Sequence, residues 1–101
     1  MNELLSFLAK NGKILIADTN SVARTAVANI LISMGVKSSQ LILVANYEQA
    51  EKEIENHKPK IVISDYDLGR RCGLDLLQKN REKNSTSKET LFFLITANAS
   101  Q

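Results

Sequence analysis

The sequence predicts an α/β domain built on a parallel sheet, and three observations support this. Short apolar runs alternate along the chain with longer stretches of helical periodicity. The runs are rich in Ile, Leu and Val without polar alternation, which is typical of strands buried on both faces. Two of the runs, 13–17 and 60–64, are followed directly by an aspartate, Asp18 and Asp65. In open parallel sheets, ligands bind at the ends of the strands where these acids fall.

Length and composition limit the chain to one soluble globular domain. It has 101 residues, is 44% hydrophobic and 24% charged, and carries a net charge of +2. That charge is too small, and aromatic residues too few, to predict nucleic-acid binding. No apolar run is long enough for a membrane span, and Glu3 is unlike the basic start of a signal peptide. The single cysteine, Cys72, forms no internal disulfide, so we expect a cytoplasmic protein.

The first half of the chain predicts a helix, a strand and a second helix. Residues 1–12 are expected to form a short helical extension, because three leucines share one helical face before an Asn-Gly stop signal. The first strand follows at 13–17. Asn20 or Ser21 can cap the next helix, since a short polar side chain can accept a hydrogen bond from a free backbone N–H group. The apolar stripe of this helix ends before Gly35, a residue suited to the C′ position.

The second half repeats the alternation of strand and helix. We predict strands at 41–45, 60–64 and 91–95 and helices at 47–56 and 74–83. Pro59 prevents the first of these helices from continuing. The connections are long enough for right-handed crossovers, so we expect the strands to be parallel.

The two strand-end carboxylates predict a cation site. If the strands that carry Asp18 and Asp65 lie close together, their oxygens can share a divalent cation such as Mg²⁺, and a cation site favours phosphate chemistry. Structural roles are open alternatives. Asp18 could simply cap the helix that follows it, and Asp67 could be an ordinary turn residue.

Two blocks of sequence resemble the receiver domain of two-component response regulators. Lys13–Ser21 resembles the first strand and acidic turn of that family, and Ile63–Leu77 resembles its phosphoacceptor strand, loop and third helix. Leu94–Ala97 resembles the end of its fourth strand. The resemblance covers residues 13–101 and implies a flavodoxin-like, doubly wound parallel sheet of order 2-1-3-4-5, with the receiver domain at 13–101.

The resemblance also implies a role for each site residue. Asp65 matches the aspartate that accepts a phosphoryl group from a histidine kinase or phosphotransfer protein, and Asp18 matches an acidic Mg²⁺ ligand. Asp67 matches the position whose backbone carbonyl binds the metal. Thr96 matches the hydroxyl that turns toward the phosphoryl group, and Ala97 matches the small residue that leaves room above the site. Such a domain is a signalling module that assists only its own phosphorylation and dephosphorylation.

The sequence departs from the family at two places. Thr19 stands where a second acid is usual, so we expect a weakened Mg²⁺ site. The chain ends at Gln101, whereas the family continues through a fourth helix, a fifth strand that ends in Lys and a fifth helix. We therefore expect a fragment with an open edge on its fourth strand. A second copy could pair with that edge or with the N-terminal helix, and no nucleic-acid or membrane partner is expected.

Two other functions stay open on the sequence alone. A pseudo-receiver would keep the fold and signal through protein contacts without phosphorylation, which Thr19 and the missing Lys favour. A haloacid-dehalogenase-type phosphohydrolase is suggested by Asp65-Tyr66-Asp67, which resembles the nucleophile motif of that family. Gly69 stands where that family usually has Thr or Val, and too few residues follow for its later motifs.

Overall fold

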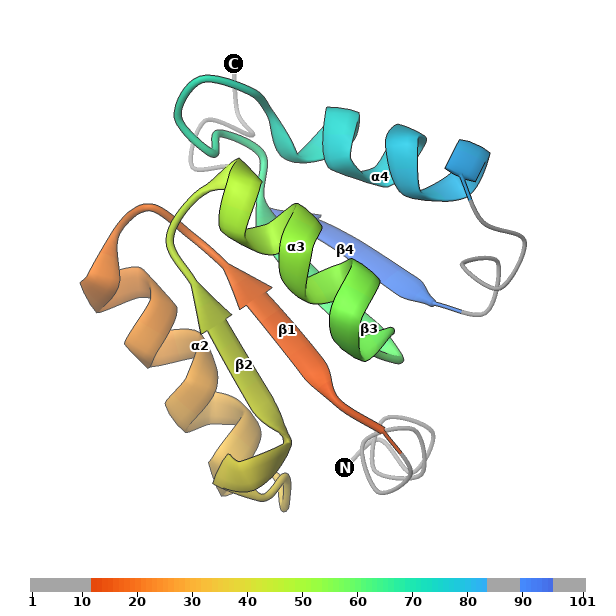
Figure 1. Cartoon of the computed structure of the whole chain (residues 1–101). Coiled ribbons are helices and arrows are strands. Elements are labelled where there is room, and N and C mark those ends of the chain that lie inside the picture. The colour runs from red at the N-terminus through yellow and green to blue at the C-terminus, as the bar shows by residue number, and fades with distance from the viewer. Residues whose placement is uncertain (1–11, 84–89, 96–101) are drawn as a thin grey trace.

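The computed structural model describes residues 12–83 and 90–95, and these form a single parallel sheet with helices on both faces (Figure 1). The sheet order is β2-β1-β3-β4, and each neighbouring pair is parallel. The strands are β1 (Ile14–Ala17), β2 (Leu41–Val44), β3 (Ile61–Asp65) and β4 (Leu91–Ile95), and the helices are α2 (Ser21–Ser33), the short 3₁₀ helix η1 (Ser38–Gln40), α3 (Tyr47–His57) and α4 (Gly73–Lys83).

This arrangement confirms the predicted α/β class and the flavodoxin-like strand order 2-1-3-4. The predicted strands and helices agree with the observed ones to within a residue or two, and η1 was not predicted. The helical extension predicted for residues 1–12 lies almost wholly outside the described residues. Among the described residues, no helix is long and apolar enough to cross a membrane.

The core consists of two apolar layers, one on each face of the sheet. Alternate residues of β1 supply both layers, because successive side chains of a strand point to opposite faces. On one face Ile14 and Ile16 pack with Ala28 and Leu31 of α2. On the other face Leu15 belongs to a cluster with side chains of β3, α3 and α4, namely Val62, Tyr47, Ala50, Ile54 and Leu76. All four residues of β1 are buried, which explains why this strand reads as continuously apolar.

Local signals set both ends of α2. The side chain of Asn20 accepts a hydrogen bond from Ala23 N at 2.9 Å, so Asn20 rather than Ser21 is the cap. At the other end, Gly35 has a φ of 107° and Val36 N donates to Leu31 O at 3.1 Å. This is the Schellman pattern that the glycine predicts.

Among residues 12–83 and 90–95, strand β4 lies at the edge of the sheet, and one of its faces is partly exposed. Leu91, Phe93 and Ile95 are 40%, 49% and 49% exposed. Their pairing with β3 places them on the same face of the sheet as α2. Helix α2 packs against β1 on this face and does not reach β4. Phe92 packs instead against the cluster on the α3 and α4 face. Helix α4 packs against that face of β4, so Phe93 and not Phe92 is among the exposed side chains of the strand.

Candidate functional site

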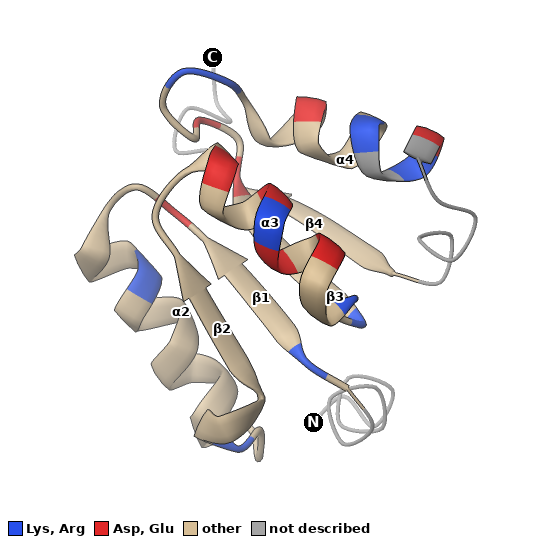
Figure 2. Ribbon diagram, viewed as in Figure 1, with Lys and Arg blue, Asp and Glu red and all other residues tan. Residues whose placement is uncertain are grey.

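The register of the sheet brings Asp18 and Asp65 to one edge. Ala17 of β1 pairs with Ser64 of β3, so the next residue of each strand, Asp18 and Asp65, stands at the same level. Asp18 N donates to Val44 O at 3.1 Å, which continues the strand pairing past the last residue of β1. The predicted pair of strand-end acids is thus formed by adjacent strands. Figure 2 shows these acidic segments at the ends of β1 and β3.

Asp65 sits in an environment that disfavours its charge. Partial burial is the main reason that the pKa of this carboxyl lies above its ordinary value. A hydrogen bond from Asp67 N to Asp65 Oδ1, at 3.4 Å, opposes the rise. The negative charges of Asp18 and Asp67 add to it. Three carboxylates therefore interact electrostatically here, and a bound cation would relieve their repulsion.

Asp18 is held in place through its side chain and its backbone. One carboxylate oxygen accepts a hydrogen bond from Asn20 N at 2.9 Å, and the Asp18 carbonyl accepts one from Arg24 Nη1 at 2.6 Å. Because Asn20 caps α2, the alternative in which Asp18 is the helix cap is wrong. Sequence reasoning missed Arg24, the only charged residue of α2. Thr19, where the family usually has an acid, is exposed beside this pair.

The side chain of Asp67 stabilises a turn, and its backbone carbonyl takes no part in the hydrogen bonds of the nearby antiparallel bridge. Its carboxylate accepts a hydrogen bond from Gly69 N at 3.0 Å, and Gly69 has a φ of 94°. Asp67 and Cys72 form an isolated antiparallel bridge. Its hydrogen bonds run from Leu68 N to Arg71 O and from Gly73 N to Tyr66 O. The two roles predicted for Asp67 are therefore compatible, because its side chain serves the turn while its backbone carbonyl stays available as a metal ligand.

Gly73 allows the first turn of α4 to approach the end of β3. A Cβ atom at this position would lie 2.6 Å from Asp65 O and 2.8 Å from Ser64 Oγ. The buried Ser64 hydroxyl itself donates to Asp65 O at 2.9 Å. The backbone of Asp65 is therefore packed directly against a glycine, a close approach that sequence reasoning did not identify.

The donor set of this edge fits a magnesium ion. Carboxylate and carbonyl oxygens are the hard ligands that Mg²⁺ prefers, and Mg²⁺ usually retains several waters, so few protein ligands suffice. Within residues 12–83 and 90–95, no group of three acidic, histidine or cysteine side chains is arranged to hold a metal. A cation at this edge would therefore have at most two of these side chains as ligands, and any further protein ligand would be a backbone carbonyl. Thr96 and Ala97, the other two predicted site residues, lie outside the described residues.

A comparison with protein-family models decides the family. The model of the response regulator receiver domain matches residues 14–101. The chain belongs to this family. A solved crystal structure, the N-terminal domain of an uncharacterized protein from Wolinella succinogenes, is similar at a TM-score of 0.72 and 21% identity. The match covers 86% of this chain and 65% of that structure, and at this identity it supports the fold alone. No curated protein matches the chain.

The raised pKa of Asp65 predicts how its replacement changes stability with pH. Folding favours the protonated form, so the contribution of Asp65 to stability is full below its ordinary pKa of 3.8 and is lost as pH rises through the folded-state value. Without divalent cations, Asp65→Asn is therefore expected to unfold at a higher temperature than the parent near neutral pH. The difference should shrink toward pH 3.8. Thermal unfolding by circular dichroism measures both, and a lower Tm for the variant at neutral pH would contradict the prediction.

Proposed function

We propose that this chain is a phosphorylatable receiver of the cytoplasm that takes a phosphoryl group from a histidine kinase or phosphotransfer protein onto Asp65. The observation that supports this most is the pairing of Asp18 with Asp65 at adjacent strand ends, close enough for one charge to raise the pKa of the other carboxyl. Two such carboxylates at a ligand-binding edge are suited to a cation, and a cation is what phosphoryl transfer to a carboxylate needs.

The proposed transfer is a displacement at phosphorus. A carboxylate oxygen of Asp65 forms a bond to phosphorus while the bond from phosphorus to the donor's imidazole nitrogen breaks, and that electron pair returns to the imidazole. Bound Mg²⁺ would be held by Asp18, Asp65 and the Asp67 carbonyl and would neutralise charge on the transferred oxygens. The hydrogen bond that Asp67 N donates to Asp65 Oδ1 would limit the rotation of this carboxylate. Thr96 and Ala97 are proposed to meet the new charge and to leave room for it.

Phosphoryl analogues test the proposal. Beryllofluoride with Mg²⁺ is expected to shift the backbone amide resonances of residues 65–69. Acetyl phosphate is expected to transfer one phosphoryl group to the protein, which mass spectrometry would detect. If neither reagent acts on folded protein, the domain is a pseudo-receiver, the alternative that Thr19 favours. Turnover of p-nitrophenyl phosphate would instead favour a phosphohydrolase.

The proposed weak cation site can be strengthened by restoring an acid. Thr19 is exposed beside Asp18, so an aspartate there would add a negative charge without burying it. We expect Thr19→Asp to tighten Mg²⁺ binding by about tenfold, the scale of one added carboxylate acting on a divalent cation near a protein surface. Calorimetric titration measures the change, with Thr25→Asp, on the exposed side of α2, as the control. Equal affinities for Thr19→Asp and the parent would argue that position 19 is outside the site.

In the part of the chain that the structure describes, β4 is an edge strand, and this supports a proposal about partners. Leu91, Phe93 and Ile95 present a row of half-exposed apolar side chains on the edge strand. Such edges pair readily with other strands. We propose that a second copy covers this edge, which light scattering across a range of protein concentrations would detect as a dimer; a monomer at all concentrations would contradict it.

A further inference from the structure

Tyr47 lies beneath the loop that connects β3 to α4. It is the first residue of α3, and only 1% of it is exposed. Its ring belongs to the same apolar cluster as Leu68, which directly follows Asp67, and Leu76 of α4. Asn46 holds this end of α3 by accepting a hydrogen bond from Gln49 N at 2.9 Å. A capped helix end thus presents an aromatic ring to the loop that carries Asp67.

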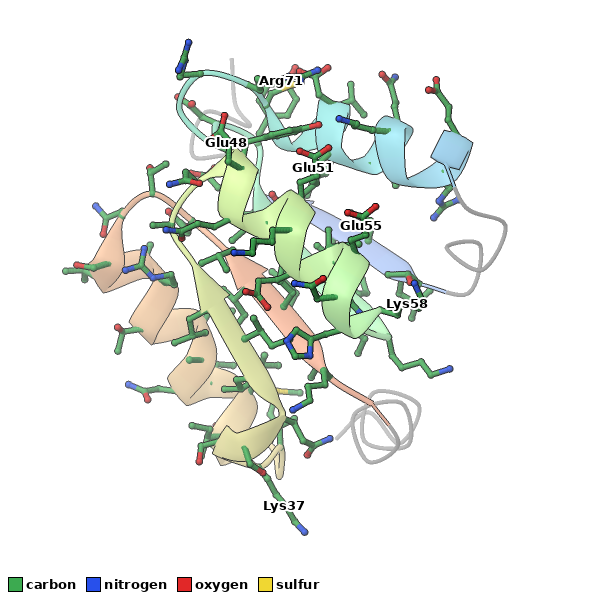
Figure 3. The ribbon with its side chains drawn as sticks, viewed as in Figure 1. Lys37, Glu48, Glu51, Glu55, Lys58 and Arg71 are labelled. Atoms are coloured by element: carbon green, nitrogen blue, oxygen red, sulfur yellow. The ribbon has the colours of Figure 1, made fainter. Side chains whose placement is uncertain are left out.

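Arg71 reaches over the same ring from within the loop. Its guanidinium carbon lies 4.6 Å from the centre of the Tyr47 ring, within the range of a cation–π contact. The Arg71 carbonyl accepts a hydrogen bond from Leu68 N at 3.1 Å, so the two loop residues associated with Tyr47 are also bonded to each other. Figure 3 shows Arg71 near the N-terminal ends of α3 and α4. The loop therefore meets α3 through the contact of Arg71 with Tyr47, and Leu68 belongs to the same apolar cluster as that ring.

A second link fixes the helix that follows the loop. Lys79 of α4 forms an ion pair with Glu51 of α3. Helix α4 begins at Gly73, directly after the loop. The ion pair therefore connects the helix that follows the loop to α3, the helix that carries Tyr47. Only exposed or partly exposed side chains make the pair, so its own contribution to stability is small. Its effect is to keep α4 aligned with α3.

We propose that Tyr47 and Arg71 form a clamp that positions residues 66–72, and with them the Asp67 carbonyl, for cation binding. The inference rests on the proposed function of Asp65 and extends it, because it assigns positioning roles to residues outside the acidic edge. Neither residue touches the cation. The clamp acts by reducing the number of loop conformations, so that less order must be gained when the cation binds.

The charge of Arg71 by itself would have the opposite effect. A cationic side chain near an acidic site repels a metal ion, so removing it should tighten cation binding. The clamp requires removal of Arg71 to weaken binding. Arg70 is the matched control, since it is the exposed neighbour in the same loop and its replacement changes charge equally. The sign of the two effects therefore separates positioning from electrostatics.

The experiment measures Mg²⁺ affinity by amide chemical shifts in the full chain. Arg71→Gln is expected to weaken binding about two- to fivefold, the range of an exposed cation–π contact, while Arg70→Gln leaves it unchanged or tighter. Tyr47→Phe should retain parent affinity, because the buried hydroxyl has no hydrogen-bond partner among the described residues, whereas Tyr47→Leu should weaken binding. Equal or tighter binding by Arg71→Gln would overturn the clamp.

A cation-free measurement keeps this test separate from the proposed function. The Leu68 amide donates to the Arg71 carbonyl, so its hydrogen exchange should be faster in Arg71→Gln and unchanged in Arg70→Gln. If the parent binds no Mg²⁺, the proposed function fails and the exchange rates still test the clamp. If the parent binds Mg²⁺ but the exchange rates of the two variants agree, the clamp fails and the proposed function stands.

Discussion

Replacing Asp65 by Asn is expected to abolish phosphoryl uptake. The carboxylate of Asp65 is the proposed nucleophile, and an amide oxygen cannot form the acyl phosphate. Uptake from acetyl phosphate, followed by mass spectrometry, should fall by at least roughly a thousandfold, because the nucleophile is removed rather than weakened. The variant should stay folded, since Asn can still accept the hydrogen bond from Asp67 N.

Asp67→Asn is the matched control for this result. It removes the same charge two residues further on, and its amide oxygen can still accept the hydrogen bond from Gly69 N that closes the turn. The backbone carbonyl proposed to bind the cation is unchanged. We expect this variant to take up phosphoryl, with a changed lifetime of the product. Uptake by Asp65→Asn equal to that of the parent would place the acceptor elsewhere and end the proposal.

The strands and most of the acidic edge could be predicted because their signals are local. An apolar strand such as Ile61–Asp65 is visible without knowledge of its neighbours, and a carboxylate at its end needs only strand order and register to find a partner. Helix α2 ends before Gly35 as predicted, because the left-handed backbone conformation after a helix favours glycine in any context. The family resemblance supplied the roles of the residues.

The features that depend on tertiary contacts could not be predicted. Tyr47 stands at the start of a mostly polar helix, and nothing in the local pattern shows that residues from another loop bury its ring. The alternation in β4 defines two faces, but which of them is covered depends on where α4 lies. The close approach of Gly73 to Asp65 likewise depends on how α4 packs against β3, which no local sequence pattern shows.

Gly73→Ala is expected to destabilise the fold and to disturb Asp65 at the same time. The added methyl group would lie 2.6 Å from the backbone oxygen of Asp65 and 2.9 Å from a methyl carbon of Leu94, so β3 and α4 must move apart. Overpacking of this kind typically costs about 1–3 kcal/mol of unfolding free energy. Because the displaced atom belongs to the proposed phosphoacceptor, beryllofluoride binding should weaken as well. Chemical denaturation and amide shifts measure the two effects.

Gly35→Ala separates the loss of stability from the loss of the site. Gly35 has a φ of 107° and open space around its Cα, so a methyl group there strains the backbone without a clash. It lies at the C-terminal end of α2, away from the edge that carries Asp65. We expect this variant to lose about 1 kcal/mol or more of stability, through strain alone, and to bind beryllofluoride as the parent does. If both glycine variants bind the analogue as well as the parent, the contact between α4 and β3 supports the fold and does not position Asp65.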